Sequence, residues 1–175
     1  MRLLLDTHIF LWFISGDSRL PANWRDSIRD PGNAVYLSVV CVWEAIVKHR
    51  LGKLPLPHPP EHYLPAQRIR HQIASLPLDE ASVCQLATLP AVHRDPFDRM
   101  LVCQALEHGL TVVTVDPVFR AYPAPILGHT EPRRAQKQLL GYAGESVEPS
   151  LAACFCTECI ARSRKRWVYS AAPMS

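Results

Sequence analysis

Glycine is scarce in this chain, with seven residues scattered over 175 positions. The sequence contains no P-loop pattern and no other glycine-rich loop that could cradle a phosphate with backbone amides. A phosphate ligand would therefore have to be bound by side chains or by a metal ion.

Long apolar runs are absent as well. No run approaches the roughly 20 residues that cross a bilayer, and Arg2 is followed by only three leucines before Asp6, which is not the layout of a signal peptide. We therefore expect no membrane partner and a cytoplasmic location. In that compartment the six cysteines are expected to be reduced thiols or metal ligands.

A large positive charge is also missing from most of the chain. The net charge is +3, but residues 132–175 hold seven Lys/Arg against three Glu, whereas residues 1–131 hold twelve basic and thirteen acidic residues. Net charge therefore gives no support for nucleic-acid binding by residues 1–131.

An apolar segment stands at the N-terminus, where residues 2–5 (RLLL) end abruptly on Asp6. A continuous apolar run of this kind is typical of a strand buried on both faces of a parallel sheet. Asp6 then lies where the first strand ends, and ligands of open α/β sheets bind outside the carboxyl ends of the strands. Thr7 and a helix-like run at residues 8–14 follow.

The remaining pattern alternates strands with helices, which predicts βαβ units, a parallel sheet and the α/β class. Strands are expected at residues 2–5, 34–38, 75–78, 110–115 and 126–127, and helices at 8–14, between 18 and 30, and at 39–51, 61–71, 80–89 and 98–108. The helix at 39–51 is expected to pack through a stripe at helical spacing, with Glu44 off its centre. That stripe consists of Val39, Val42, Trp43, Ile46 and Arg50.

Four carboxylates recur at strand ends and helix starts of this pattern, namely Asp6, Glu44, Asp98 and Asp116. Three of them converge directly on the carboxyl edge of the sheet, and Asp98 joins them if the loop before its helix lies on that side. Clustered carboxylates repel one another unless a cation neutralises them, and oxygen ligands suit Mg²⁺ or Mn²⁺. Such a cation can activate water for attack on a phosphodiester.

Each acidic residue also has an ordinary structural alternative. Glu44 precedes Lys48 by four residues, the favourable order for a helix ion pair, and Asp98 and Asp116 are both placed to cap a helical turn. Asp95 precedes a proline and is expected to shape its loop. Arg99 is expected either to hold RNA phosphate or to form an ordinary ion pair.

Three ordered motifs carry a family resemblance: LLLDTHIFLW, SVVCVWEAIVKHRLGKL and HRDPFDRMLVCQALEHGLTVVTVD. Over about residues 1–127 the chain resembles PIN-domain proteins, and more narrowly the VapC toxins of bacterial toxin–antitoxin pairs. The resemblance implies a three-layer α/β/α sandwich with a parallel sheet. It also implies a Mg²⁺-dependent endoribonuclease, a cognate antitoxin partner and a homodimer. The homodimer is expected as well from exposed apolar helices, such as the one at residues 9–14.

The resemblance also assigns roles to residues. It implies that Asp6, Glu44, Asp98 and Asp116 are the catalytic and metal-binding carboxylates, with Thr7 and Thr114 as flanking hydroxyls. Arg99 is placed to support them. Two further hypotheses stay open from the sequence: a non-catalytic PIN-like module that binds RNA or protein, and a phosphohydrolase of small substrates, which Thr7-His8 disfavours because no second aspartate follows Asp6.

Residues 128–175 depart from the family pattern and are expected to form a separate C-terminal extension. Cys154, Cys156 and Cys159 could join His129 on Zn²⁺, although the spacing is not a paired CxxC. The run RSRKR at 162–166 could add sequence-independent attraction to phosphates. A poorly ordered accessory tail is the alternative for the whole extension.

Overall fold

The computed structural model describes residues 1–92 and 94–127. The expectations for the extension at 128–175, including its zinc site and basic run, lie outside the described residues. Within the described part, no helix is both long enough and apolar enough to cross a membrane.

A four-stranded parallel sheet forms the centre of the fold, with the strand order β3-β2-β1-β4. The residue Leu5 at the end of β1 is in register with Leu37 of β2 and Val113 of β4. The carboxyl ends of the three strands therefore lie at one edge. The strands are β1 (Arg2–Leu5), β2 (Ala34–Ser38), β3 (Ala74–Leu76) and β4 (Thr111–Val113).

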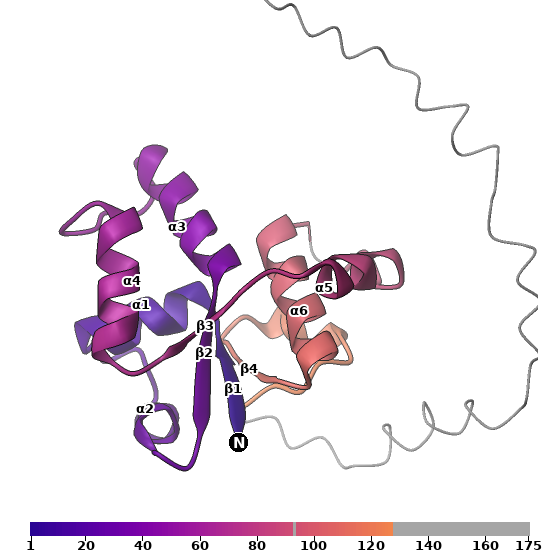
Figure 1. Cartoon of the computed structure of the whole chain (residues 1–175), viewed down its shortest axis with the longest axis horizontal. Helices are drawn as coiled ribbons and strands as arrows, with labels where there is room; N and C mark the ends of the chain where they lie inside the picture. Colours follow the sequence, from indigo (N-terminus) through magenta and orange to yellow (C-terminus); the bar gives the residue numbers. More distant parts are fainter. Residues whose placement is uncertain (93, 128–175) are drawn as a thin grey trace, which may run out of the picture. The chain divides into compact units, whose positions relative to one another are not determined.

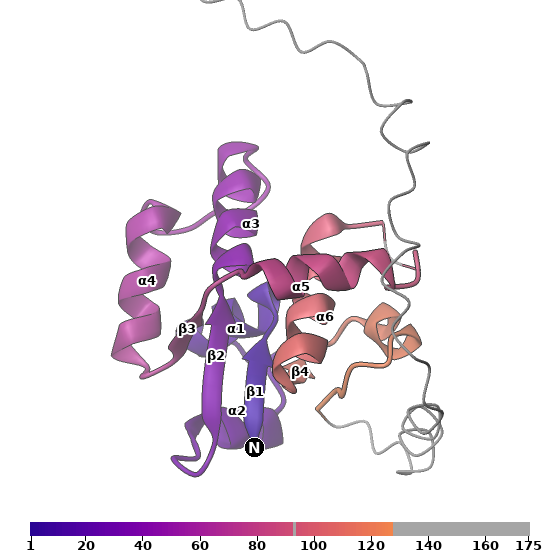
Figure 2. The same cartoon turned by 45° about the vertical axis from the view of Figure 1, so that its right-hand side comes forward.

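Helices fill each connection between the strands. Because such crossovers are right-handed, the connections running outward from β1 to β3 place their helices on one face, and the connection back to β4 uses the other. Figures 1 and 2 show this arrangement, with α1, α2 and α4 on one side of the strands and α5 and α6 on the other. The helices are α1 (Thr7–Ser15), α2 (Ala22–Arg29), α3 (Val39–Arg50), α4 (Pro60–Arg70), α5 (Glu80–Cys84) and α6 (Pro96–His108), with 3₁₀ turns η1 (Gln85–Ala87) and η2 (Pro117–Ala121).

The core lies on both faces of the sheet, which explains the apolar run at the N-terminus. Leu3, Leu4 and Leu5 are fully buried, as are Val112 and Val113 on the neighbouring strand. Burial of each such side chain contributes roughly 1.5–3 kcal/mol. The predicted α/β class with its three-layer arrangement is confirmed.

The packed face of α3 differs from the predicted stripe. Val39 and Trp43 are 40% and 57% exposed, whereas Val40, Cys41, Glu44 and Ala45 are buried. The prediction assumed that the most apolar stripe faces the core. Here the buried face instead includes a carboxylate, because α3 starts at the carboxyl edge and packs against α1.

Smaller differences concern other elements. The helix expected at 80–89 is interrupted, since α5 stops at Cys84 and a 3₁₀ turn follows in which Thr88 N donates to Gln85 O. Tightening into 3₁₀ geometry is common at helix ends. The strand expected at 126–127 is a single parallel bridge between Ile126 and Val112.

The apolar run at 9–14, offered above as support for a homodimer, is only partly accessible. Ile9, Phe10 and Phe13 are buried in the core, whereas Leu11 and Ile14 are half-buried. The homodimer itself stays a prediction.

Candidate functional site

Asp6 stands at the junction between β1 and α1. Its backbone N donates to Val113 O at 3.1 Å and its carbonyl accepts from Phe10 N at 3.0 Å, so the residue ends the strand and starts the helix. The side chain does not cap α1. It is 6% exposed, and its Oδ2 accepts a hydrogen bond from Thr114 Oγ1 at 2.8 Å.

The electrostatic environment of Asp6 disfavours its charge. Burial raises the pKa of Asp6, and the nearby charge of Glu44 acts in the same direction. The hydrogen bond from Thr114 and the charge of His8 oppose this shift without cancelling it. A cation beside Asp6 would favour the ionised form.

Glu44 is the second buried carboxylate, with 4% of its surface exposed. Its Oε2 accepts a hydrogen bond from Thr7 Oγ1 at 2.5 Å, and its Oε1 pairs with Lys48 Nζ one helical turn on. The ion pair offered above as the structural alternative for Glu44 is therefore present. It places a lysine ammonium at the site together with the carboxylate.

The two threonines have matching roles. Thr7 and Thr114 are both buried. The Thr7 hydroxyl donates its hydrogen bond to Glu44, and the Thr114 hydroxyl donates its hydrogen bond to Asp6. The Oγ1 of Thr114 also accepts from Asp116 N at 3.1 Å. The hydroxyls therefore fix the direction in which the buried carboxylates point.

Lys48 also belongs to the site. The sequence predicted only its pairing with Glu44. Its side chain is 31% exposed. Burial lowers the pKa of Lys48, but the hydrogen bond and charge of Glu44, with the charges of Asp95 and Asp98, raise it overall. Carboxylates on α3 and at the start of α6 thus both act on the charge of this ammonium.

The start of α6 separates two roles that the sequence left open. Asp95 caps the helix, because its Oδ1 accepts from Phe97 N at 2.9 Å. Asp98 lies inside the first turn, half-buried, so the capping alternative for Asp98 is wrong. The prediction that Asp95 shapes its loop is confirmed.

Asp116 lies further from the strand than the sequence suggested, since β4 ends at Val113. Its Oδ1 accepts from Val118 N at 2.8 Å and caps the 3₁₀ turn η2. The predicted capping alternative for Asp116 is therefore present. The Thr114 side chain also connects Asp116 to Asp6, because its hydroxyl accepts from Asp116 N and donates to Asp6 Oδ2.

Arg99 is held near the loop before α6. Its Nη2 donates to Leu89 O at 3.5 Å, while its buried Nε has no hydrogen-bond partner among residues 1–92 and 94–127. Its predicted supporting role stays a prediction.

A buried polar bridge connects α3 to α6. Ser38 Oγ accepts from Val40 N at 3.0 Å, capping α3, and donates to Gln104 Oε1 at 2.5 Å. Gln104 Nε2 in turn donates to Pro77 O at 2.9 Å. Both side chains are fully buried, so they fix the helix of Glu44 relative to the helix of Asp98. Only the capping role of Ser38 was predictable from the sequence.

A buried thiol lies beneath the two carboxylates. Cys41 donates to Leu5 O at 3.6 Å. Burial raises the pKa of Cys41, a hydrogen bond with Thr7 opposes this shift, and the charges of Asp6 and Glu44 add to it. Cys41 therefore stays a neutral thiol and supplies neither a nucleophile nor a thiolate ligand.

The donor set has the chemistry of a hard divalent cation site. Asp6, Glu44, Asp98 and Asp116 offer only oxygens, and Asp6 is buried without enough positive charge to keep its pKa at the ordinary value. Across residues 1–92 and 94–127, no three or more His, Cys, Asp or Glu side chains are grouped so as to hold a metal ion. The residues fit such a cation by type, and their metal role stays a prediction.

Three comparisons relate the chain to known proteins. The family model of the PIN domain matches residues 3–125. Ribonuclease VapC16 of Mycobacterium tuberculosis is 37% identical over 57 residues, which are 33% of this chain and 40% of that protein. The matched segment thus spans less than half the length of this relative.

Solved structures share the fold at low identity. A chain of VapBC2 from Rickettsia felis, bound to a DNA fragment from their promoter, superposes with a TM-score of 0.55 and 16% identity, covering 72% of this chain and 96% of that chain. A chain of DNA-bound VapBC from Salmonella typhimurium gives a TM-score of 0.52 and 18% identity, with coverages of 72% and 96%.

Proposed function

The chain belongs to the PIN-domain family, and on this premise we propose that it is a metal-dependent endoribonuclease that hydrolyses RNA phosphodiester bonds as the toxin of a toxin–antitoxin pair. The observation that carries the proposal is the pair of buried carboxylates, Asp6 and Glu44, at the carboxyl edge of the sheet, each oriented by a threonine hydroxyl. Burial of a carboxylate costs free energy unless a counter-charge, hydrogen bonds or a metal ion compensate it; Glu44 has Lys48, whereas the pKa of Asp6 stays raised by burial and a cation would compensate its charge. The ribonuclease relative supports the choice of reaction.

Mg²⁺, or Mn²⁺ in its place, is the proposed cofactor, held by Asp6, Glu44, Asp98 and Asp116. When bound, such a cation polarises a phosphoryl oxygen and lowers the pKa of a bound water. The oxygen-only donor set and the raised pKa of Asp6 support this assignment.

The protein's own side chains prepare the site for that cation. Thr114 and Thr7 hold one oxygen each of Asp6 and Glu44, so these carboxylates do not rotate freely. Lys48 compensates part of the negative charge through Glu44. Such preorganisation reduces the rearrangement that substrate binding requires.

An RNA digest tests the proposal. Labelled transfer RNA is incubated with the full chain in EDTA and again after Mg²⁺ is added in excess. We expect cleavage only with Mg²⁺, and a loss of about 100-fold or more for Asp98→Asn and Glu44→Gln. Asp79→Asn, an aspartate that caps α5, is the matched control and is expected to cleave like the wild type.

Two results would contradict the proposal. Undiminished cleavage by Asp98→Asn would remove that carboxylate from the mechanism. Binding of RNA without cleavage at any Mg²⁺ or Mn²⁺ concentration would favour a non-catalytic PIN-like binding module instead.

We also propose a protein antitoxin as partner, since the solved structures named above are VapBC assemblies. A groove of about 360 Å³ between α1 and the segment at 54–57 is available for an apolar segment of such a partner, with Leu11, Trp12 and Leu56 on its walls. Co-expression with the product of the neighbouring open reading frame is expected to give a stable complex. Leu11→Glu is expected to weaken the complex, and Leu51→Glu, an exposed leucine outside the groove, is not.

A further inference from the structure

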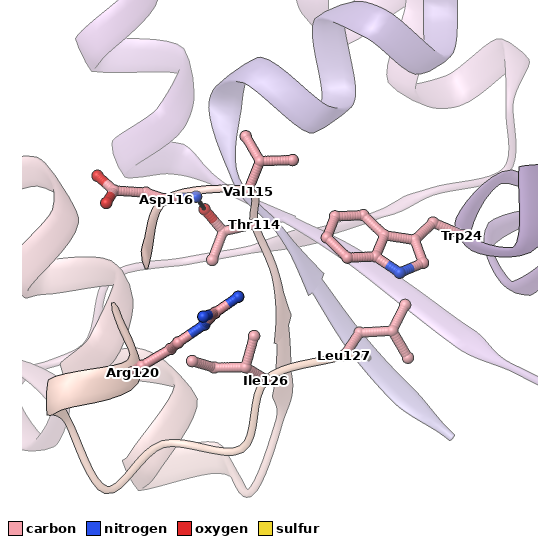
Figure 3. Close-up of a pocket in the computed structure, with 7 residues that line it drawn as sticks. All are labelled: Trp24, Thr114, Val115, Asp116, Arg120, Ile126 and Leu127. Carbon is pink, nitrogen blue, oxygen red and sulfur yellow. Dashed lines mark hydrogen bonds between the residues drawn. The ribbon is translucent and has the colours of Figure 1, made fainter. Parts of the chain in front are cut away.

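A second cavity lies beside the carboxyl end of β4. It has a volume of about 220 Å³, and Figure 3 shows the side chains around it. They come from α2, from the segment that follows β4, and from the bridge residue Ile126 with its neighbour Leu127. The lining consists of Trp24, Thr114, Val115, Asp116, Arg120, Ile126 and Leu127.

This cavity shares a wall with the candidate active site. Thr114 lines it, and the hydroxyl of the same residue donates to Asp6 Oδ2 at 2.8 Å. Asp116 lines it as well and donates its backbone N to Thr114. A molecule in the cavity would therefore lie one side chain away from the buried carboxylate Asp6.

The apolar part of the lining suits a flat ring. Trp24 is half-buried and faces the cavity across from Arg120, with Leu127 below it in Figure 3. Stacking of a nucleobase on an aromatic side chain stabilises binding, whatever the base. An indole between aliphatic side chains can therefore stack with one base, and such stacking does not depend on which base it is.

The charged part of the lining suits a phosphate. Arg120 is exposed, and its guanidinium points in among the other lining side chains, whereas the Asp116 carboxylate points away from it (Figure 3). No described residue forms a salt bridge with Arg120. Guanidinium groups bind phosphate oxygens in a bidentate manner, so Arg120 has both the charge and the geometry to hold one.

The volume limits what can enter. Pockets for drug-sized ligands measure roughly 300–1,000 Å³, and this cavity is smaller. It is too small for a stretch of duplex. It has room for the base of a single unpaired nucleotide, with the phosphate at the rim, where Arg120 is exposed.

We propose that this cavity binds one unpaired nucleotide of an RNA strand, with the base against Trp24 and the phosphate on Arg120. The proposal rests on the proposed ribonuclease function and adds a nucleotide subsite, formed by Trp24 and Arg120, next to the site of cleavage. The same chemistry would admit a free mononucleotide, and the experiment below separates the two sources.

The test measures binding without cleavage. A fluorescein-labelled single-stranded RNA of roughly 12 nucleotides, within the size range of single-strand sites, is titrated with the full chain in EDTA, and its anisotropy is recorded. We expect Arg120→Gln to weaken binding about tenfold and Arg120→Lys less. The matched control is Arg70→Gln, at an exposed arginine on α4. This helix packs on β3, the edge strand farthest from β4. We expect the RNA affinity of the control to stay within about twofold of the wild type.

Trp24 needs a separate design, because it also packs on the core. Trp24→Phe keeps an aromatic face, whereas Trp24→Leu removes it. We expect the two variants to have equal thermal stability and Trp24→Phe to bind RNA more strongly than Trp24→Leu. A fully paired RNA duplex is expected to compete poorly with the single strand. Adenosine monophosphate is expected to compete only at much higher concentration, since it lacks the flanking chain.

The outcomes decide between this proposal and its premise. Equal weakening by Arg120→Gln and Arg70→Gln, or a duplex that competes as well as the single strand, overturns the nucleotide site. Competition by the mononucleotide at the same concentration as the RNA also overturns it and points to a free nucleotide as the ligand. Because these measurements are made in EDTA, a failure of Mg²⁺-dependent cleavage contradicts the proposed function without changing them.

Discussion

Thr114 and Asp6 are 108 positions apart in sequence, yet the Thr114 hydroxyl donates a hydrogen bond to Asp6 Oδ2 at 2.8 Å inside the protein. The parallel pairing of β1 with β4 brings them together, because both residues follow the carboxyl end of their strand. The bond orients a buried carboxylate and favours its ionised form.

Replacing Thr114 by valine tests this relationship with little change of shape. We expect a loss of about 1–3 kcal/mol in the free energy of unfolding, because Asp6 Oδ2 and Asp116 N each lose a partner. Urea unfolding measures it. Thr111→Val, the same substitution at the half-buried first residue of β4, is expected to stay within about 0.5 kcal/mol. A Thr114→Val protein as stable as the Thr111→Val control would show that the hydroxyl has no such role.

Lys48→Met removes the ammonium that neutralises Glu44. The carboxylate is 4% exposed, so its charge would remain buried without compensation. The Lys48 side chain itself is 31% exposed, and we therefore expect a loss of about 1–3 kcal/mol, below that of a fully buried pair.

A double-mutant cycle isolates the Lys48 effect. Glu44→Gln with Lys48→Met is expected to recover part of the loss, because the uncompensated charge is then gone. Lys53→Met, an exposed lysine after α3, is the control. Additive losses in the double variant would mean that Lys48 stabilises the fold through packing alone.

Ser38→Ala tests the bridge between α3 and α6. The variant loses the cap on Val40 N and leaves the buried Gln104 Oε1 without its donor. The two effects together are expected to cost about 2–4 kcal/mol. Ser15→Ala, which removes an exposed hydroxyl on α1, is expected to change the unfolding free energy by less than about 0.5 kcal/mol. Similar losses in the two variants would contradict the bridge.

Asp79 provides a prediction for pH. The backbone hydrogen bond from Ser82 lowers the pKa of Asp79, followed by the Ser82 hydroxyl and the nearby His108. A carboxyl whose pKa is lower when folded contributes stability above its unfolded value of about 3.9, and this contribution is lost as pH falls through the folded pKa.

Asp79→Asn keeps a good capping side chain and removes the charge. We expect the difference in unfolding free energy between wild type and variant to shrink as pH falls below about 4. Urea unfolding at a series of pH values measures it. A difference that grows toward acid would contradict the direction given for the pKa.

The sequence predicts the sheet better than the face of α3. The apolar run before Asp6 is buried on both sides, so its pattern depends on local burial alone, and the position of Asp6 follows from it. The burial of Glu44 could not be predicted in this way. The apolar stripe with Val39 and Trp43 predicted a different buried face of α3, and those two residues are exposed. The burial of Glu44 depends on Thr7, a contact across 37 positions.

The two carboxylates at the start of α6 also differ in how far the sequence predicts them. Asp95 precedes a proline, so its capping role follows from local chemistry. The position of Asp98 relative to Lys48 depends on how α6 packs against α3, which Gln104 and Ser38 fix through a contact across 66 positions. Tertiary contacts of this range leave no periodic signal in the sequence.

Binding of Mn²⁺, followed by isothermal titration calorimetry, tests most directly whether the buried carboxylates form a cation site. The wild type, Asp6→Asn and the control Asp79→Asn are titrated without RNA, so that the result does not depend on cleavage. We predict that Asp6→Asn loses binding while Asp79→Asn retains it. Equal affinity of the wild type and Asp6→Asn for Mn²⁺ would contradict the account.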